Sequence, residues 1–203
     1  MSRGMNMHNL KPIKNPEMIT CVSTEVLDWH HNKHQKGYVD KRNEIEKKLE
    51  TADKTSANAN FSEWRELKKE ETFNAAGMIL HEAYWDSLGG EGILGDDLAI
   101  SRKIEEDFGS FEKWRDDFIA TAKAARGWVI LCYDFSDKKL HNFLVDSHQD
   151  GAVWGAVPLL ALDVWEHSYY REHGPDRAAY ITKFMQNIDW EGINEKFEEK
   201  VPQ

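Results

Sequence analysis

Residues 128–145 read WVILCYDFSDKKLHNFLV, and this stretch decides the fold class. Residues 128–135 are rich in β-branched and aromatic side chains, which favour strands. Ser136-Asp137-Lys138 has the composition of a turn, and residues 140–145 alternate enough to form a returning strand. Together with a third apolar run at 157–162, the stretch predicts a small antiparallel sheet.

The chain around these strands has helical patterns. Residues 24–49 and 61–88 predict two long helices joined by a polar turn, with a break in the second expected near Glu71. Shorter helices are expected at 98–107, 111–125, 165–173, 177–187 and 190–199. The predicted fold class is α+β: an N-terminal antiparallel helical hairpin, then a C-terminal domain of helices and a three-stranded antiparallel sheet.

Glycine and proline mark the expected domain limits. Pro12 and Pro16 indicate an extended arm, and Gly89, Gly90 and Gly92 indicate a boundary after the second long helix. We therefore expect an arm over 1–22, a hairpin domain over 23–90 and an α/β domain over 91–203.

Composition excludes several classes of protein. The net charge of −10 argues against nucleic acid or an anionic membrane as the main partner, although a local cluster of cations can still attract an anionic substrate. Cys21 and Cys132 form no Cys-x-x-Cys pair, and such sparse cysteine fits a reducing compartment. The chain has no apolar run near the ~20 residues that span a bilayer and no secretion signal at its start. We expect a cytoplasmic protein.

Asp163 and His167 are the first candidates for chemistry. Asp163 closes an apolar strand, and His167 follows four residues later, so both side chains point the same way if a helix begins here. An unpaired buried carboxylate is costly, and a metal cation would compensate for it. The alternative is an aspartate that caps the next helix, followed by a surface histidine.

Further histidines lie on the two long helices. His30 and His34 share one helix face, and burial of His81 favours the neutral imidazole that binds metals. A lone histidine on an apolar helix is usually an ordinary core residue, but the chain has nine, and their placement matters. Three imidazoles and one carboxylate suit iron, manganese or zinc and leave a coordination position for water or substrate.

At these residues the chain resembles the iron/manganese superoxide dismutase family. The family signature D-x-W-E-H-x-Y-Y is present at 163–170, and H-x-x-x-H-x-x-x-Y at 30–38. F-N-x-A-G…H-x-x-x-W matches 73–85, and the glycine-tryptophan that opens the sheet matches Gly127-Trp128. The resemblance covers roughly residues 22–199 in order, including Asn187–Trp190.

The resemblance implies a reaction and a set of site residues. One superoxide is oxidised to oxygen and the next is reduced to hydrogen peroxide, while the metal alternates between +3 and +2. Tyr38 matches the family's gateway tyrosine, a proton-relay group, and His34 matches the histidine beside it. The implied metal ligands are His30, His81, Asp163 and His167.

A hydrogen-bond donor to the metal-bound solvent tunes the metal potential. In the family this donor is Gln, sometimes His; the location for Gln on the second helix matches Gly77 here. The donor is then expected in Ser147-His148-Gln149-Asp150, where we favour His148 over Gln149. A His donor with Gly77 resembles iron-using or metal-flexible members, so we expect one iron per subunit, with manganese or either metal as alternatives.

The resemblance also implies a homodimer or tetramer. Glu166 matches the acceptor for His167 of the partner subunit, and Tyr170 matches the residue that reaches the partner's His34. Two departures concern the pocket rim: Gln35 replaces the usual histidine, and Ile130 replaces the second tryptophan of G-W-x-W.

Three other readings compete. A mononuclear iron oxygenase would use two His and one carboxylate, but usually on an all-β barrel. A di-iron bundle needs paired E-x-x-H motifs, which the sequence lacks. A metal-storing or degenerate homologue is disfavoured because the ligand set and Tyr38 are complete.

Overall fold

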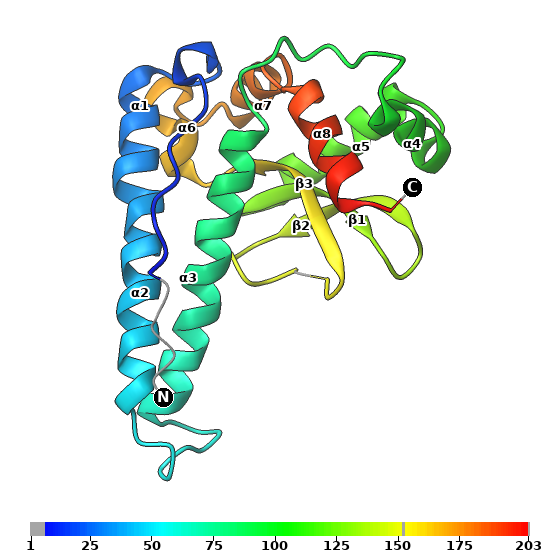
Figure 1. Ribbon diagram of the computed structural model, residues 1–203. Helices are drawn as coiled ribbons and strands as arrows, with labels where there is room; N and C mark the ends of the chain where they lie inside the picture. Colours follow the sequence, from blue (N-terminus) through cyan, green and yellow to red (C-terminus); the bar gives the residue numbers. More distant parts are fainter. Residues whose placement is uncertain (1–6, 152, 203) are drawn as a thin grey trace.

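The computed structural model describes residues 7–151 and 153–202. Its N-terminal half is a long helical hairpin (Figure 1). One arm runs without interruption through α1 (Thr24–Trp29), the π-helical segment η2 (His30–Gln35) and α2 (Lys36–Thr51). The other arm is α3 (Glu63–Asp86), which packs against α2.

Helix α3 has no break near Glu71, so that expectation is wrong. Glu71 pairs with Lys68 one turn earlier, which supports the helix at this point. The Ser62 side chain caps the helix by accepting from the backbone N–H of Arg65 at 3.2 Å. Helix α3 is therefore continuous, and its buried C-terminal half packs against β3 of the sheet.

The sheet has the expected three antiparallel strands, β1 (Trp128–Asp134), β2 (Lys139–Val145) and β3 (Ala156–Asp163). Their order is β2-β1-β3, so β1 is central, and all its residues are buried. Trp128 at the start of β1 lies opposite Val145 on one side and Asp163 on the other. The register thus fixes the position of Asp163 at one end of the sheet.

Further helical elements outside the hairpin complete the predicted α+β class. They are η1 (Pro16–Met18), α4 (Ala99–Phe108), α5 (Phe111–Ala124), α6 (Glu166–His173), α7 (Arg177–Met185) and α8 (Trp190–Lys200). Among the described residues, no helix has both the length and the apolar composition that a bilayer crossing requires.

The N-terminal arm is extended from residue 7 apart from η1; residues 1–6 of the expected arm lie outside the described part. It is tied to the hairpin, because the His8 backbone N–H donates to Asn43 Oδ1 at 2.8 Å. At its other end, the Thr20 N–H donates to Asn187 Oδ1, also at 2.8 Å. These bonds join the arm to both halves of the chain.

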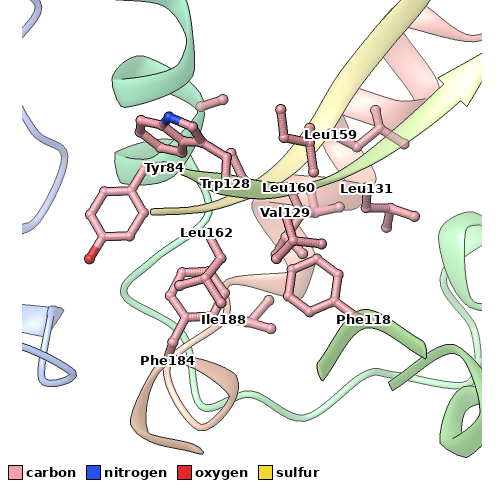
Figure 2. Close-up of a cluster of buried hydrophobic side chains, with 14 of the residues drawn as sticks. Tyr84, Phe118, Trp128, Val129, Leu131, Leu159, Leu160, Leu162, Phe184 and Ile188 are labelled. Atoms are coloured by element: carbon pink, nitrogen blue, oxygen red, sulfur yellow. The ribbon is translucent and has the colours of Figure 1, made fainter. Parts of the chain in front are cut away.

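One apolar core joins the sheet to the helices (Figure 2). Trp128, Leu160 and Leu162 are fully buried in it, and Phe118 of α5 and Phe184 of α7 pack against the same strands. Tyr84 brings α3 into this core. Such close packing allows little movement, so the sheet end and α3 are held in a fixed relation.

Candidate metal centre

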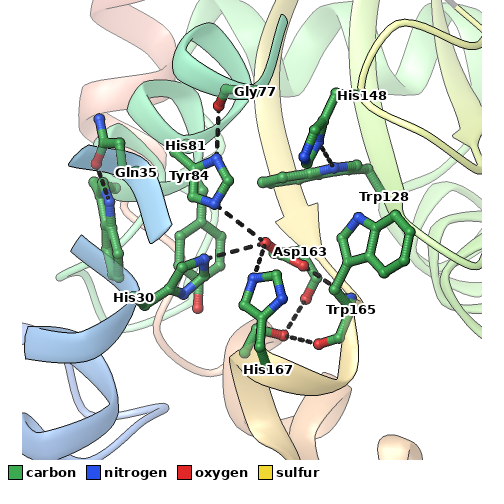
Figure 3. A network of polar contacts seen from close by, with 12 residues as sticks. His30, Gln35, Gly77, His81, Tyr84, Trp128, His148, Asp163, Trp165 and His167 are labelled. Atoms are coloured by element: carbon green, nitrogen blue, oxygen red, sulfur yellow. Dashed lines mark hydrogen bonds and ion pairs between the residues drawn. The ribbon is translucent and has the colours of Figure 1, made fainter. Parts of the chain in front are cut away.

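Four side chains from four separate elements meet at the end of β3 (Figure 3). His30 comes from η2, His81 from α3, Asp163 from the last position of β3 and His167 from the first turn of α6. One potential ligand atom from each lies within 4.8 Å of those of the other three. Three of the four residues are at most 1% exposed, and His167 is partly buried.

The three imidazoles converge on one carboxylate oxygen of the fourth residue, Asp163. Asp163 Oδ2 lies 3.1 Å from His30 Nε2, 3.7 Å from His81 Nε2 and 3.4 Å from His167 Nε2. Bonds of about 2.0–2.2 Å to a shared ion place neighbouring ligand atoms roughly 3–3.5 Å apart. The buried Nε2 atoms of His81 and His167 have no hydrogen-bond partner among the described residues. This donor set therefore fits a metal ion.

Local hydrogen bonds orient two of these groups. His81 Nδ1 lies 2.6 Å from the Gly77 carbonyl oxygen, which can only accept, so Nδ1 carries the proton. The lone pair of His81 is then on Nε2, the atom that faces Asp163. Asp163 Oδ1 accepts from the Trp165 backbone N–H at 2.8 Å, which leaves Oδ2 for the imidazoles.

Burial and charge set the protonation of the cluster. Burial lowers the pKa of His30 and places that of His81 well below its ordinary value, so both imidazoles are neutral. Burial by itself would raise the pKa of Asp163, but the positive charge of a protonated His167 and the hydrogen bond from His30 outweigh burial and lower the pKa. Neutral imidazoles beside an ionised carboxylate are the forms that bind a metal.

Aromatic rings enclose the cluster. The Tyr38 ring lies 5.2 Å from that of His81 and 4.7 Å from that of His148, between centroids. A Cβ at Gly77 would come within 2.9 Å of the Tyr38 ring, so the missing side chain makes room for Tyr38. Burial, helped by the charge of Asp163, raises the pKa of Tyr38 to about 12, which keeps its hydroxyl protonated at neutral pH.

His34 stacks on His167, with ring centroids 4.1 Å apart and planes at 13°. Partial burial, with the positive charge of His167 and His30 when protonated, lowers the pKa of His34 to about 4. His34 is thus exposed to solvent and lies beside two of the four residues, since its ring centroid is also 6.2 Å from that of His30.

The two rival donors, His148 and Gln149, differ in environment. His148 is 4% exposed, and its Nδ1 accepts from the Trp128 indole N–H at 3.0 Å. Burial lowers the pKa of His148 to about 4. Gln149 is only partly buried, and its Oε1 accepts from the Ser147 hydroxyl at 3.0 Å. His148 is therefore the one that faces Tyr38 and His81.

Two buried residues near the centre were not identified from the sequence as its neighbours. Gln35, noted only as a departure, is fully buried, and its Oε1 accepts from the Trp85 indole N–H at 2.8 Å. Tyr84, which was not singled out, places its ring 5.2 Å from His30 and bonds to the Tyr180 hydroxyl at 3.0 Å. Its position three residues after His81 on a buried helix was the available signal.

Glu166 and Tyr170, the expected dimer residues, are both exposed in the single chain. They lie on α6, on either side of His167 in sequence. A contact across a subunit interface would require this face of α6 to be accessible, as it is.

Family comparisons bear directly on this geometry. Residues 12–89 match the α-hairpin domain of iron/manganese superoxide dismutases, and residues 96–196 match the C-terminal domain of the same enzymes. The chain belongs to the iron/manganese superoxide dismutase family. The cluster of His30, His81, Asp163 and His167 is consistent with the metal site of such an enzyme.

Curated relatives of this superoxide dismutase carry both metals in their names. A "Superoxide dismutase [Mn] 1" of Halobacterium salinarum is 42% identical over 182 residues, 88% of each chain. A "Superoxide dismutase [Fe]" of Aquifex pyrophilus is 42% identical over 202 residues, 96% of this chain and 93% of the relative. A "Superoxide dismutase [Mn] 2" of Haloferax volcanii is 40% identical over 89% of each chain. The enzyme is thus an oxidoreductase that converts superoxide to oxygen and hydrogen peroxide with iron or manganese.

Proposed function

We propose that His30, His81, Asp163 and His167 hold one iron ion per subunit, with manganese or either metal as the alternative. The convergence of three Nε2 atoms on Asp163 Oδ2 carries this proposal. A bound iron or manganese would supply the one-electron redox chemistry of superoxide dismutation. An iron-named relative covers 96% of this chain, and manganese-named relatives are as similar in identity, so sequence likeness alone favours neither metal.

His148 is the proposed hydrogen-bond donor to solvent in the metal pocket. An indole N–H can only donate, so the bond from Trp128 makes His148 Nδ1 an acceptor and puts the ring proton on Nε2. Among the described residues, His148 Nε2 has no hydrogen-bond partner, so its N–H is free to donate. Gln149 is the rival, and its bond to Ser147 argues against it.

Tyr38 and His34 form the proposed entrance to the centre. Tyr38 keeps its proton at neutral pH and lies against both His81 and His148, so it can pass a proton to a reduced substrate. His34 is exposed and stacks on His167, which places it between solvent and the ligand set. Superoxide is the small anionic substrate.

The proposed assembly is a homodimer or tetramer that uses α6. Glu166 would accept from the partner's His167, and Tyr170 would reach the partner's His34. Exposure of both residues beside the partly buried His167 supports this. We also propose that the chain divides into an arm over 1–22, a hairpin domain over 23–90 and an α/β domain over 91–203. A cytoplasmic location is proposed as well, because the free thiols of Cys21 and Cys132 fit a reducing compartment.

Elemental analysis and reconstitution test the metal proposal. The protein is stripped, reloaded with iron or manganese separately and assayed for superoxide turnover. We expect one catalytic metal per chain and higher activity with iron. Higher activity with manganese would overturn the choice of iron.

Paired variants test the donor. His148→Ala is expected to shift the reduction potential of the metal and lower activity, whereas Gln149→Ala leaves both unchanged. An unchanged potential in His148→Ala with a shifted one in Gln149→Ala would move the role to Gln149.

A further pair of variants tests the dimer. Glu166→Ala should yield monomers in sedimentation experiments. Glu105→Ala, which changes an exposed glutamate on α4, should not. A stable, active Glu166→Ala dimer would exclude the bridge.

A further inference from the structure

A second group of metal-binding side chains lies at the turn between β1 and β2. Asp134 ends β1, Asp137 lies in the turn, and His141 lies on β2. One potential ligand atom from each lies within 4.8 Å of the other two, and His141 Nε2 is 2.9 Å from Asp137 Oδ2. Two carboxylates and one imidazole therefore meet at one point of the hairpin.

The turn itself holds the two carboxylates in place. Asp134 Oδ1 accepts from the Ser136 backbone N–H at 2.8 Å, and Asp137 Oδ1 accepts from the Lys139 N–H at 3.0 Å. Each aspartate uses one oxygen for the backbone and keeps Oδ2 available. The oxygen of Asp137 that contacts His141 is this second one.

Asp134 has an unusual lack of partners for its burial. It is 7% exposed, yet among the described residues no Lys, Arg or His nitrogen lies within 4.0 Å of its carboxylate. Its Oδ2 has no hydrogen-bond donor in the same part of the chain. Lys139, its neighbour across the strands, forms no ion pair with it there. A cation bound at the turn would supply the counter-charge that the largely buried Asp134 side chain lacks among the described residues.

We propose that Asp134, Asp137 and His141 bind a divalent transition-metal ion, with Zn²⁺ as the probe. Imidazole and carboxylate ligands suit zinc and similar ions, whereas magnesium and calcium prefer oxygen ligands alone. Two carboxylates neutralise the charge of the ion, and water completes its coordination. The ion would link the end of β1 to β2 across the turn.

This site is separate from the redox centre. Strand β1 begins at Trp128, opposite Asp163, and ends six residues on at Asp134. At about 3.4 Å per residue the strand separates the two sites by about 20 Å. An ion bound at the turn would raise the metal content of the protein without taking part in superoxide turnover.

Zinc titration of the protein already loaded at the redox centre tests the site. Equilibrium dialysis and calorimetry should find one further Zn²⁺ per chain, with iron or manganese content and activity unchanged. His141→Ala on β2 and Asp137→Asn in the turn should bind this ion at least about tenfold more weakly, the lower limit for losing even an outer-shell partner. His8→Ala is the matched control, because His8 contacts the single carboxylate of Glu46 at 3.0 Å and should bind zinc as the wild type does.

Three results would overturn the proposal. The first is no zinc uptake beyond the redox centre in the wild type. The second is equal zinc affinity in His141→Ala and the wild type, when circular dichroism shows both folded. The third is full displacement of the ion by equimolar Mg²⁺, which would exclude a transition-metal site. None of these results bears on the redox centre, whose metal and activity are measured in the same samples.

Discussion

The indole Nε1 of Trp128 donates a 3.0 Å hydrogen bond to Nδ1 of His148, and both residues are buried. Trp128 also lies opposite Asp163 in the sheet. The strand register thus places a proposed metal ligand, Asp163, directly opposite the residue that supports the proposed donor. Burial lowers the pKa of His148 to about 4, so at neutral pH the ring is neutral and its one proton is on Nε2.

Trp128→Phe is predicted to lower activity about tenfold, at the low end for loss of a partner that orients a metal-site group. The phenyl ring keeps most of the apolar contact but cannot hold the proton of His148 on Nε2. The reduction potential of the metal should shift as well, and electrochemistry checks this directly.

Trp114→Phe is the control for that change. Trp114 is also fully buried, and its Nε1 donates to Asn142 Oδ1 at 3.1 Å, away from the metal centre. Each variant loses one hydrogen bond, about 1 kcal/mol of stability, but only Trp128→Phe should lose activity. Equal activity losses in the two would refute a specific role for Trp128.

Gly77→Ala is predicted to destabilise the protein by about 1–3 kcal/mol, the usual cost of overpacking a core. The new Cβ would lie 2.9 Å from the Tyr38 ring, which must move away from His81 and His148. Activity should fall with stability. Denaturant titration and superoxide assays measure both effects.

Gly37→Ala, on the neighbouring helix α2, is predicted to stabilise the protein instead of destabilising it. A Cβ at Gly37 meets no atom within 4 Å, so alanine should stabilise α2 by up to about 1 kcal/mol. Activity should not change. If Gly77→Ala were as stable as Gly37→Ala, the close contact with Tyr38 would be disproved.

Sequence patterns predicted most of the fold because its helices and strands have clear periodicity and turn residues. The three strands and the α+β class are confirmed, and helix bounds differ by one or two residues at most ends. The break near Glu71 was wrong, because polar residues there form an exposed, ion-paired helix surface rather than a turn. Local sequence cannot distinguish these two cases.

For the metal centre, the four candidate ligands were found from short motifs, and the structure brings them together. Gln35 and Tyr84 were not found as site neighbours, since their bonds to Trp85 and Tyr180 join residues about 50 and 96 positions apart in the chain. Sequence spacing does not reveal these long-range bonds, although the position of Tyr84 three residues after His81 was a local signal that it lies near the centre. The π-helical turn at His30–Gln35 was likewise unforeseen.

Because both cysteine thiols are buried, we predict that the protein loses stability at high pH. Burial raises the pKa of Cys21 and of Cys132 from an ordinary value of 9 to about 12. Above pH 9 the unfolded chain releases these protons while the folded chain keeps them, so stability falls as pH rises from 9 towards 12. Each thiol contributes a slope of up to about 1.4 kcal/mol per pH unit.

Cys132→Ala should therefore show a shallower decline over this range than the wild type, measured by denaturant titration at several pH values. Its stability at pH 7 is the reference, so that any cavity left by the substitution cancels. Equal slopes would show that Cys132 titrates normally in the folded protein. At pH 8 a thiol reagent should react with both cysteines only after denaturation.

The central claim is that the four converging residues hold one redox metal. Asp163→Asn tests it most directly, because the amide has nearly the shape of the carboxylate but lacks its charge. Iron and manganese content and superoxide turnover are measured for both proteins after identical loading. We predict one catalytic metal per chain and full activity in the wild type, and loss of most of both in Asp163→Asn. An Asp163→Asn protein with full metal content and full activity would contradict the account.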